Sequence, residues 1–513
     1  MKRFFLRTKN QWLVLSILIL VSAPSTIAFL HPGFPQTDDG NWMIIRLSAF
    51  YETIRAGEFP VRWLSRLNNG YGYPVANFLY PGFMYLGVPI TILTSSFVVT
   101  TKLLFVFSLI GSCLGMYLWL RGTFNQWSSF VGALVYLYSP YHLYDATVRG
   151  SLGEVLALAI IPYVFWAIDR RTTWLTGLLL GFFLISHNTL ALLFLPIVIT
   201  YQALVSGEGI SSWQERWVGT ILGVTLSSFF WIPALVDLGS TVFSEVTVSN
   251  WMEYFADFGL IGLVQIVVIG VGLFILILKK QNILRENKVV VFFILLAVAT
   301  VFLSTHFSGL IWELLPVQFI QFPFRILSLT IFAVAFLCAW LLQLSNRSVL
   351  YGCFILLIAA VSAYPYITPS QYDYLEDGFY STNQATTTIK NEYMSKGVKE
   401  APVARSEIVT TQDALVSDLV HRGTTVSFIV NTKKTEQIQI NQMYFPGWKV
   451  WIDNREVPVV RDNPNGVMEV VVGKGVHSVK ASFEETPIRL GANLISLLSL
   501  ALILWFLLKR LKI

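Results

Sequence analysis

Charged residues are scarce in this chain of 513 residues, because Asp, Glu, Lys and Arg together make up only 13% of it. Soluble domains average about 25% charged residues, so the composition excludes a soluble globular protein. No basic patch interleaved with aromatic residues occurs outside short loops. The net charge of +6 therefore does not indicate binding to nucleic acid.

Cysteine and the common catalytic motifs are equally rare. The three cysteines, Cys113, Cys338 and Cys353, lie in apolar segments, which predicts inert core residues rather than a disulfide framework. The chain has no Cys/His spacing typical of zinc sites, no glycine-rich phosphate loop and no Ser-His-Asp signature. Soluble hydrolases and nucleotide-dependent enzymes are therefore disfavoured.

Long apolar runs dominate the composition, which is 55% hydrophobic. Runs of about 17–22 residues are long enough to cross ~30 Å of hydrocarbon as helices, so we predict a polytopic α-helical membrane protein. The predicted set of about twelve spans is 12–30, 100–120, 127–140, 152–168, 173–186, 189–205, 217–237, 258–278, 289–307, 323–344, 349–367 and 489–508. A basic start before the first run leaves a cleaved signal peptide open as an alternative to an anchor.

The stretch 78–98 decides the topology. Counting it as a span would place Arg121 and the pair Arg170–Arg171 outside the cell. A re-entrant or interfacial element instead keeps every basic cluster in the cytoplasm, and Pro81 and Pro89 suit such a broken helix. We therefore predict a multi-pass protein of the cytoplasmic (inner) membrane with both termini in the cytoplasm.

Residues 1–368 form the predicted transmembrane domain, which includes a long outer loop at 31–77. Apolar residues recur near helical spacing from Trp42 to Phe59, with charged residues between them. This pattern predicts an amphipathic helix lying in the membrane interface, a depth that also suits Trp63.

Residues 369–488 are more polar and form the predicted exoplasmic region. Alternating runs such as TVSFIV, QIQINQMYF, KVWID, MEVVV and HSVKASF, separated by turn signals, predict an all-β, sandwich-like domain from about residue 400. The range 489–513 then holds a last transmembrane helix, which tethers this domain, and a basic cytoplasmic tail.

Several polar residues fall where this threading places the outer ends of helices. Ionisable residues at such depth are costly and often functional. The candidates are Asp38, Asp39, Arg149, Glu154, His187, Asn188, Gln321 and Arg325. Weaker members of the same pattern, interpreted as solvated or capping residues, are Asp237, Glu253, Asp257, His306 and Glu313.

Each candidate also has a structural interpretation. Asp38 or Asp39 caps the following helix, since a carboxylate accepts from free N–H groups at a helix start. Arg149 and Glu154 form an ordinary ion pair at the start of a span. His187 packs as a hydrogen-bonded core residue, and Arg325 reaches for the lipid headgroups.

Together, carboxylates and cations at one outer site suit sugar transfer from a polyprenyl-phosphate donor, whose phosphate lies at headgroup level. Transfer to a hydroxyl needs a carboxylate that takes the acceptor proton. It also needs cations such as Arg149 and Arg325, with His187 as a further donor, to stabilise the departing phosphate. Two alternatives stay open: a flippase or transporter of lipid-linked sugars, although no inverted repeat is evident, and an inactive envelope scaffold.

Longer segments carry a family resemblance. The first loop, which opens with acidic residues and runs into GEFPVRWLSRLNNGYGYPVANFLYPGFMYL, resembles that of GT-C-fold membrane glycosyltransferases. The segments YLYSPYHLYDATVRGSLGEVLALAIIPYVFWA, SHNTLALL, QFPFRIL and YFPGWKVWIDNREVPV resemble the bacterial membrane-protein family labelled 6-pyruvoyl-tetrahydropterin synthase-related, and the neighbouring YfhO-like proteins. Nothing in the chain resembles the His-rich zinc site of a soluble pterin synthase.

The resemblance implies glycosyl transfer on the outer face of the cytoplasmic membrane, and it does not supply the sugar or the acceptor. Our first hypothesis takes an envelope glycan, glycolipid or protein as the acceptor. The acidic residue of the first loop in GT-C enzymes is the general base or a metal ligand, and by position Asp39 matches it best. Asp38 would assist or hold a divalent cation, the one cofactor left open. Met43 stands where the pattern leads us to expect His, which leaves an inactive homologue open.

The remaining candidates fall on family motifs and take their roles from them. Arg149 and Glu154 lie on an RG…E motif, and Glu154 would orient Arg149 or the acceptor. His187 and Asn188 lie on an HN motif. Arg325 lies on a PFR-like motif, and Gln321 precedes it by four residues. Arg149, His187 and Arg325 would bind the lipid phosphate, and Asn188 and Gln321 are further candidates for substrate binding.

Overall fold

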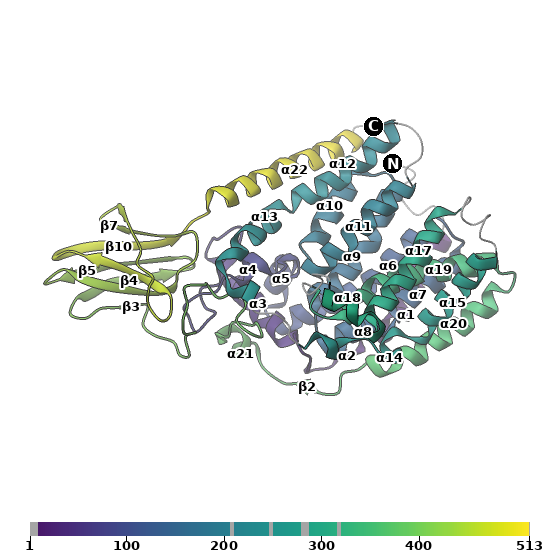
Figure 1. The fold of residues 1–513 in the computed structure, drawn as a ribbon, viewed down its shortest axis with the longest axis horizontal. Helices are drawn as coiled ribbons and strands as arrows, with labels where there is room; N and C mark the ends of the chain where they lie inside the picture. The colour runs from purple at the N-terminus through teal and green to yellow at the C-terminus, as the bar shows by residue number, and fades with distance from the viewer. Residues whose placement is uncertain (1–8, 206–209, 246–249, 279–286, 315–319, 512–513) are drawn as a thin grey trace.

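The computed structural model describes residues 9–205, 210–245, 250–278, 287–314 and 320–511, and shows a helical body with a smaller β region at one end (Figure 1). The predicted topology drew on basic clusters at 1–9 and 279–288, and most of their residues lie outside the described ranges. The sides of the membrane on which the loops lie therefore stay predictions.

Apolar helices make up most of the described chain. The longer ones are α1 (Lys9–Ser22), α3 (Gly40–Arg55), α5 (Gly82–Thr94), α6 (Phe97–Leu120), α7 (Gln126–Leu137), α9 (Leu152–Asp169), α10 (Thr173–Leu184), α11 (Asn188–Val205), α12 (Ile210–Leu226), α13 (Ser228–Asp237), α15 (Leu263–Leu278), α17 (Lys288–Ser304), α19 (Leu327–Leu344), α20 (Ser348–Ala363) and α22 (Pro487–Leu511). A helix stands at every predicted span.

Within the described residues, seven helical segments are long and apolar enough to cross a membrane. Two pairs raise this number to nine when each is counted as one span; they bend by 56° between α12 and α13, and by 86° after α17. Three apolar helices, α5, α10 and α15, are shorter. The prediction of a helical membrane protein is confirmed, with seven to nine such spans against the twelve predicted.

Burial orders the helices from the centre outward. Helices α9 and α19 are the most enclosed, with 83% and 89% of their apolar windows buried, whereas α20 and α22 have only 17% and 22% buried. Leu, Ile and Phe side chains cover the exposed faces of these outer helices. Such faces suit contact with lipid, because a helix satisfies its own backbone hydrogen bonds there.

The first loop folds into the protein instead of lying on its edge. Helix α3 forms where the apolar spacing predicts a helix, but it packs against α5 and α6, and ten of its residues are buried. The expected interface position of Trp63 is wrong, because this side chain is 0% exposed and packs against Phe445 and Phe483. Its indole thus joins the loop to the β region.

The stretch 78–98 forms α5 after the short helix α4 (Val75–Phe78). At 1.5 Å per residue, the 13 residues of α5 extend about 20 Å, which is too short for ~30 Å of hydrocarbon. Pro81 occupies the N-cap and Pro89 lies inside the helix. Helices α10 and α15 are short apolar helices as well, so the re-entrant role of this stretch stays a prediction.

Two antiparallel sheets form the β region. One has the order β4–β5–β10–β7–β8, and the other β3–β6–β9. Their bounds are β3 (Val409–Thr410), β4 (Leu415–Arg422), β5 (Thr425–Thr432), β6 (Glu436–Met443), β7 (Trp448–Ile452), β8 (Arg455–Val457), β9 (Val467–Val472) and β10 (Gly475–Phe483). Every alternating run named above is a strand, and alternate side chains of both sheets enter the hydrophobic core.

Polar residues outside the main candidates have structural roles. Asp257 caps the short helix α14 (Phe258–Ile261) by accepting from the Leu260 N–H at 2.7 Å, as the capping interpretation predicts. Asp237 is not a solvated residue, because its Oδ2 lies 2.8 Å from Arg489 Nη2 in a buried ion pair. Cys353 is exposed on α20 rather than a core residue.

Candidate functional site

A glycine contact brings the first loop against the start of α9. Arg149 ends a π-helical turn (Asp145–Arg149), and Gly150 follows it with φ of +65°. A Cβ at Gly150 would lie 2.2 Å from Thr37 Oγ1, so only glycine allows this approach. The Asp39 N–H then donates to the Arg149 carbonyl at 2.8 Å, which fixes the two residues side by side.

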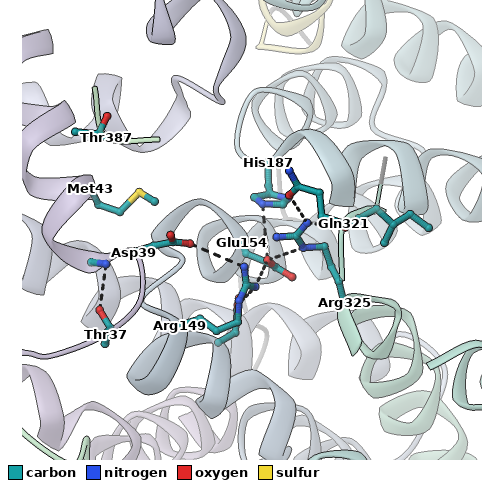
Figure 2. A network of polar contacts seen from close by, with 12 residues as sticks. Thr37, Asp39, Met43, Arg149, Glu154, His187, Gln321, Arg325 and Thr387 are labelled. Atoms are coloured by element: carbon teal, nitrogen blue, oxygen red, sulfur yellow. Dashed lines mark hydrogen bonds and ion pairs between the residues drawn. The ribbon is translucent and has the colours of Figure 1, made fainter. Parts of the chain in front are cut away.

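Asp39 occupies the N-cap position of α3 without acting as its cap. Its carboxylate makes no capping hydrogen bond, and Thr37 Oγ1 accepts from the Gly40 N–H at 3.1 Å instead. The Asp39 side chain is 25% exposed, and its Oδ2 lies 3.9 Å from Arg149 Nη2 (Figure 2). The carboxylate therefore lies at the accessible side of a buried cation.

Glu154 is the centre of the cluster and is 0% exposed. Its Oε2 accepts from Arg149 Nη1 at 2.7 Å and from Arg325 Nε at 3.2 Å, while the Tyr141 hydroxyl donates to Oε1 (Figure 2). These residues come from α9, the π-helical turn, the 3-10 turn Pro323–Ile326 and α8 (Pro140–Tyr144). One carboxylate thus holds two guanidinium groups together, which offsets its own desolvation.

Arg325 is held from its other side by the segment before it. Its Nη1 donates to the Ile320 carbonyl at 2.7 Å and to Gln321 Oε1 at 3.2 Å, so Gln321 positions the guanidinium. Phe322 lies between the two cations, with its ring centre 5.0 Å from the Arg325 Cζ and 5.4 Å from the Arg149 Cζ. These cation–π contacts stabilise both guanidinium groups, and they are stronger when the cation is shielded from water.

His187 presents a neutral ring to the same carboxylate. Its Nδ1 accepts from the Leu190 N–H at 3.2 Å, so the ring proton is on Nε2, which lies 3.7 Å from Glu154 Oε2. Burial lowers the pKa of His187 to about 3. The ring therefore offers an N–H donor without a charge.

Two predicted residues lie outside this contact network. Asn188 turns toward α4, where its Nδ2 donates to the Phe78 carbonyl at 2.7 Å. Asp38 is partly exposed to solvent. The desolvation of its covered side, followed by the charge of Asp39, raises its carboxyl pKa, although Arg149 opposes this. The described ranges contain no group of three or more His, Cys, Asp or Glu side chains placed to hold a metal ion.

Met43, which stands in place of the expected histidine, is buried and contacts Arg46, whose Nη1 lies 3.8 Å from its Sδ. Arg46 Nε in turn donates to Thr387 Oγ1 at 3.0 Å. Through Arg46, this position on α3 is therefore linked to Thr387 in the segment that follows α21 (Asp377–Thr382).

The structure adds two residues to the cluster. The sequence pattern places the first, Asp145, with Arg149 and Glu154 at the start of a span, but it is not among the selected site residues. Asp145 is fully buried, and its Oδ1 accepts from Arg149 Nη1 at 2.6 Å. Burial and the charge of Glu154 raise the pKa of Asp145 well above its ordinary value, against the pull of Arg149. Asp145 lies four residues before Arg149, and this spacing predicts that the two side chains share one helix face and can pair.

Tyr80 is a second addition. Its ring centre lies 4.6 Å from that of His187, and Gly153 gives it room, since a Cβ there would lie 2.1 Å from Tyr80 Cε2. The stretch 78–98 therefore supplies one wall of the cluster. No local sequence pattern marks this packing.

These observations define a polytopic membrane protein that encloses a polar cluster between its first loop and its most buried helices. Residues 78–370 match the family model described as "6-pyruvoyl-tetrahydropterin synthase related domain; membrane protein", and the chain belongs to this family. The resemblance predicted from the motifs is confirmed. Glu154 and Arg325 lie within the matched range, whereas Asp39 precedes it.

Solved structures with a related arrangement are larger proteins. The arabinofuranosyltransferase AftD from Mycobacteria matches at 17% identity and a TM-score of 0.47, over 72% of this chain and 28% of that one. The oligosaccharyltransferase AglB from Archaeoglobus fulgidus, in complex with an inhibitory peptide and a dolichol-phosphate, matches at 12% and 0.39, over 73% and 56%. At these TM-scores the likeness carries no functional argument. No curated protein matches the chain.

Proposed function

We propose that this protein is a membrane glycosyltransferase of the GT-C type. It moves a sugar from a polyprenyl-phosphate-linked donor to a hydroxyl of an envelope glycan, glycolipid or protein on the outer face of the cytoplasmic membrane. One observation carries the proposal: the partly exposed Asp39 carboxylate lies 3.9 Å from Arg149, which shares Glu154 with Arg325. A base thus stands beside two cations.

Asp39 takes the proton of the acceptor hydroxyl as its oxygen forms a bond to the anomeric carbon of the sugar. The bond between that carbon and the phosphate oxygen breaks, and polyprenyl phosphate leaves with the electron pair. Negative charge therefore passes from Asp39 to the phosphate. Arg149 and Arg325, with the His187 N–H, stabilise it there because their positions are fixed before the reaction.

The other candidates position these groups. Glu154 holds both guanidinium groups, Gln321 holds Arg325, and Asn188 fixes the turn that carries His187. Asp38 assists Asp39 or contributes to a divalent cation site, in which substrate oxygens would complete the coordination. The region 369–488 lies outside the membrane in this proposal and contacts the acceptor or a partner.

The test is sugar transfer by the full chain in proteoliposomes that contain a pool of polyprenyl-phosphate sugars. Asp39→Asn should lower turnover at least ~100-fold, as expected for loss of a general base. Asp38→Asn is the matched comparison, because it removes the neighbouring charge but keeps the base, and it should lower turnover less than Asp39→Asn. Equal turnover of Asp39→Asn and wild type would contradict the assignment of the base.

The predicted orientation has an independent test. Arg455 is exposed on β8, so a single cysteine at this position in a Cys353→Ser background reports the side of the β region. An impermeant thiol reagent should label Arg455→Cys on intact cells. Labelling only after the membrane is opened would place this region in the cytoplasm and overturn the proposed side of transfer.

A lipid-linked-sugar flippase is the second candidate. Two apolar helix pairs bend by 56° and 86°, and discontinuous transmembrane helices of this kind are common in transporters. The same proteoliposomes distinguish it. Movement of the lipid-linked sugar across the bilayer without transfer to an acceptor would favour the flippase. Absence of both activities would favour an inactive scaffold.

A further inference from the structure

A second polar site lies where the first loop meets the β region. It is a pocket of about 230 Å³ between the C-terminal half of α3, the loop after it and the start of the β sheets. Its polar lining comes chiefly from Glu52, Arg66, Gln384, Arg405 and His421. Because the lining offers mainly charged and hydrogen-bonding groups, the pocket suits a polar ligand rather than a lipid chain.

The pocket and the Asp39 site share one helix. Glu52 lies 13 residues after Asp39 on α3, which corresponds to about 20 Å at 1.5 Å per residue. This distance equals the length of several sugar residues. An extended glycan with its reacting end at Asp39 is therefore long enough to reach the pocket.

The charges of the pocket leave one cation in excess. Arg66 Nη1 lies 3.2 Å from Glu52 Oε2, and its Nη2 donates to Ser48 Oγ at 2.6 Å, so this pair is internally matched. Arg405 is exposed, and among the described residues its guanidinium has no hydrogen-bond or ion-pair partner. Its aliphatic chain lies over Gly70, where a Cβ would be 3.7 Å from Arg405 Cγ.

Glu52 is the one carboxylate among the lining residues of this pocket, and it is paired with Arg66, so the other polar groups beside Arg405 are uncharged. The pKa of His421 is lowered, first by burial and then by the charge of Arg405, so its ring is neutral at about pH 7. Gln384 lines the pocket, and none of the hydrogen bonds among the described residues uses its side-chain amide, whereas its backbone carbonyl accepts from the Asn69 N–H. A guanidinium fork beside an amide suits a ligand with an anionic group and hydroxyls.

We propose that this pocket binds an anionic saccharide, a sugar ring that bears a carboxylate or a phosphate. Arg405 pairs with the anion, and the Gln384 amide binds ring hydroxyls. The volume lies just below the ~300–1,000 Å³ common for small-molecule sites, which fits about one ring. This inference rests on the proposed transferase function. In that reaction the ring belongs to the acceptor glycan and lies several sugar residues from the reacting hydroxyl.

Direct binding tests the pocket without requiring transfer. The full chain in nanodiscs is titrated with an oligogalacturonate, with mannose 6-phosphate and with an uncharged malto-oligosaccharide, and binding is followed by saturation-transfer NMR and thermophoresis. At least one anionic probe should bind saturably and the uncharged one more weakly. Arg405→Gln should weaken the anionic probe about tenfold, as loss of a charge-assisted hydrogen bond predicts.

Arg455→Gln is the matched control, because it removes the same charge from exposed strand β8 and should leave binding unchanged. Gln384→Ala should weaken binding of the sugar and not of inorganic phosphate. Failure of both anionic probes to bind, equal binding of the uncharged probe, or equal effects of Arg405→Gln and Arg455→Gln would overturn the proposal.

The two proposals fail separately. Asp39→Asn should abolish transfer and leave probe binding intact. If Asp39→Asn transfers normally while Arg405→Gln loses binding, the transferase assignment is wrong and the saccharide pocket stands. If Asp39→Asn abolishes transfer and Arg405→Gln leaves binding of the anionic probes unchanged, only the pocket assignment is wrong.

Discussion

Arg149 donates from Nη1 to Glu154 Oε2 at 2.7 Å, and both side chains are at least 95% buried. The same oxygen accepts from Arg325 Nε, so two cations share one carboxylate. Burying a cation without a partner is costly. Loss of the Glu154 charge would remove the one carboxylate that pairs with Arg325 in the described ranges, and one of the three near Arg149, which also contacts Asp145 and Asp39. This contact is therefore central to both the fold of the cluster and its proposed chemistry.

Glu154→Gln should lower the free energy of unfolding by about 3–5 kcal/mol, because the amide has the shape of the carboxylate but not its charge. It should also reduce transfer by the folded fraction, because the two guanidinium groups lose the shared charge that holds them together. Unfolding in mixed micelles and turnover per folded molecule measure the two effects. Glu313→Gln, an exposed residue on α18 (Gly309–Leu314), is the control. Unchanged turnover in the folded fraction would limit Glu154 to a structural role.

The pH dependence of stability tests the environment of His187. Its pKa is about 3 in the folded protein, against about 6.5 for an ordinary histidine in the unfolded chain. Between these values the unfolded chain binds more protons than the folded one, so stability rises with pH and is lost as pH falls toward about 3. His187→Gln should therefore lose less Tm than wild type between about pH 7 and pH 4.

His31→Gln is the matched control for this measurement, since the His31 ring stacks on Tyr372 away from the cluster. It should show the same loss of Tm on acidification as wild type. The same loss in His187→Gln would contradict a buried neutral ring.

The helices of this fold are predictable from the chain because an apolar run must form internal backbone hydrogen bonds whatever it packs against. The bends are not, since the 56° angle between α12 and α13 depends on contacts with α22 and other distant segments. Strand β4 has mostly exposed residues on both faces, so it lacks the alternation that identifies β5 and β9.

The candidate site is predictable to the same limited degree. Asp145, Arg149 and Glu154 lie within ten residues, so their proximity is visible in the sequence. Arg325 lies 171 residues from Glu154, and only the packing of α19 against its neighbours brings them together. The capping role expected for Asp39 belongs to Thr37, because the approach allowed by Gly150 places that hydroxyl at the helix start.

Gly150→Ala tests this approach. The residue has φ of +65°, where a side chain costs about 1 kcal/mol or more, and a Cβ would lie 2.2 Å from Thr37 Oγ1. We expect a lower Tm and weaker transfer, because Asp39 moves away from Arg149. Gly270→Ala in α15 meets no heavy atom within 4 Å and should keep or raise Tm. Equal effects of the two substitutions would contradict the close contact.

The buried pair of Asp237 and Arg489 should hold the start of α22 against α13. Asp237 Oδ2 accepts from Arg489 Nε at 2.9 Å and from Asn77 Nδ2 at 3.0 Å, and Arg489 is 0% exposed. Asp237→Asn should cost about 3–5 kcal/mol, since it leaves a buried cation unpaired. Adding Arg489→Met should restore part of this loss, because the double variant buries no charge.

Asp462→Asn breaks the exposed pair with Lys399 and provides the contrast. The Asp462 and Lys399 side chains are 84% and 66% exposed, so we expect the free energy of unfolding to change by no more than about 1 kcal/mol. Unfolding in mixed micelles measures all four proteins. A double variant no more stable than Asp237→Asn would show that the pair does not act through its buried charges.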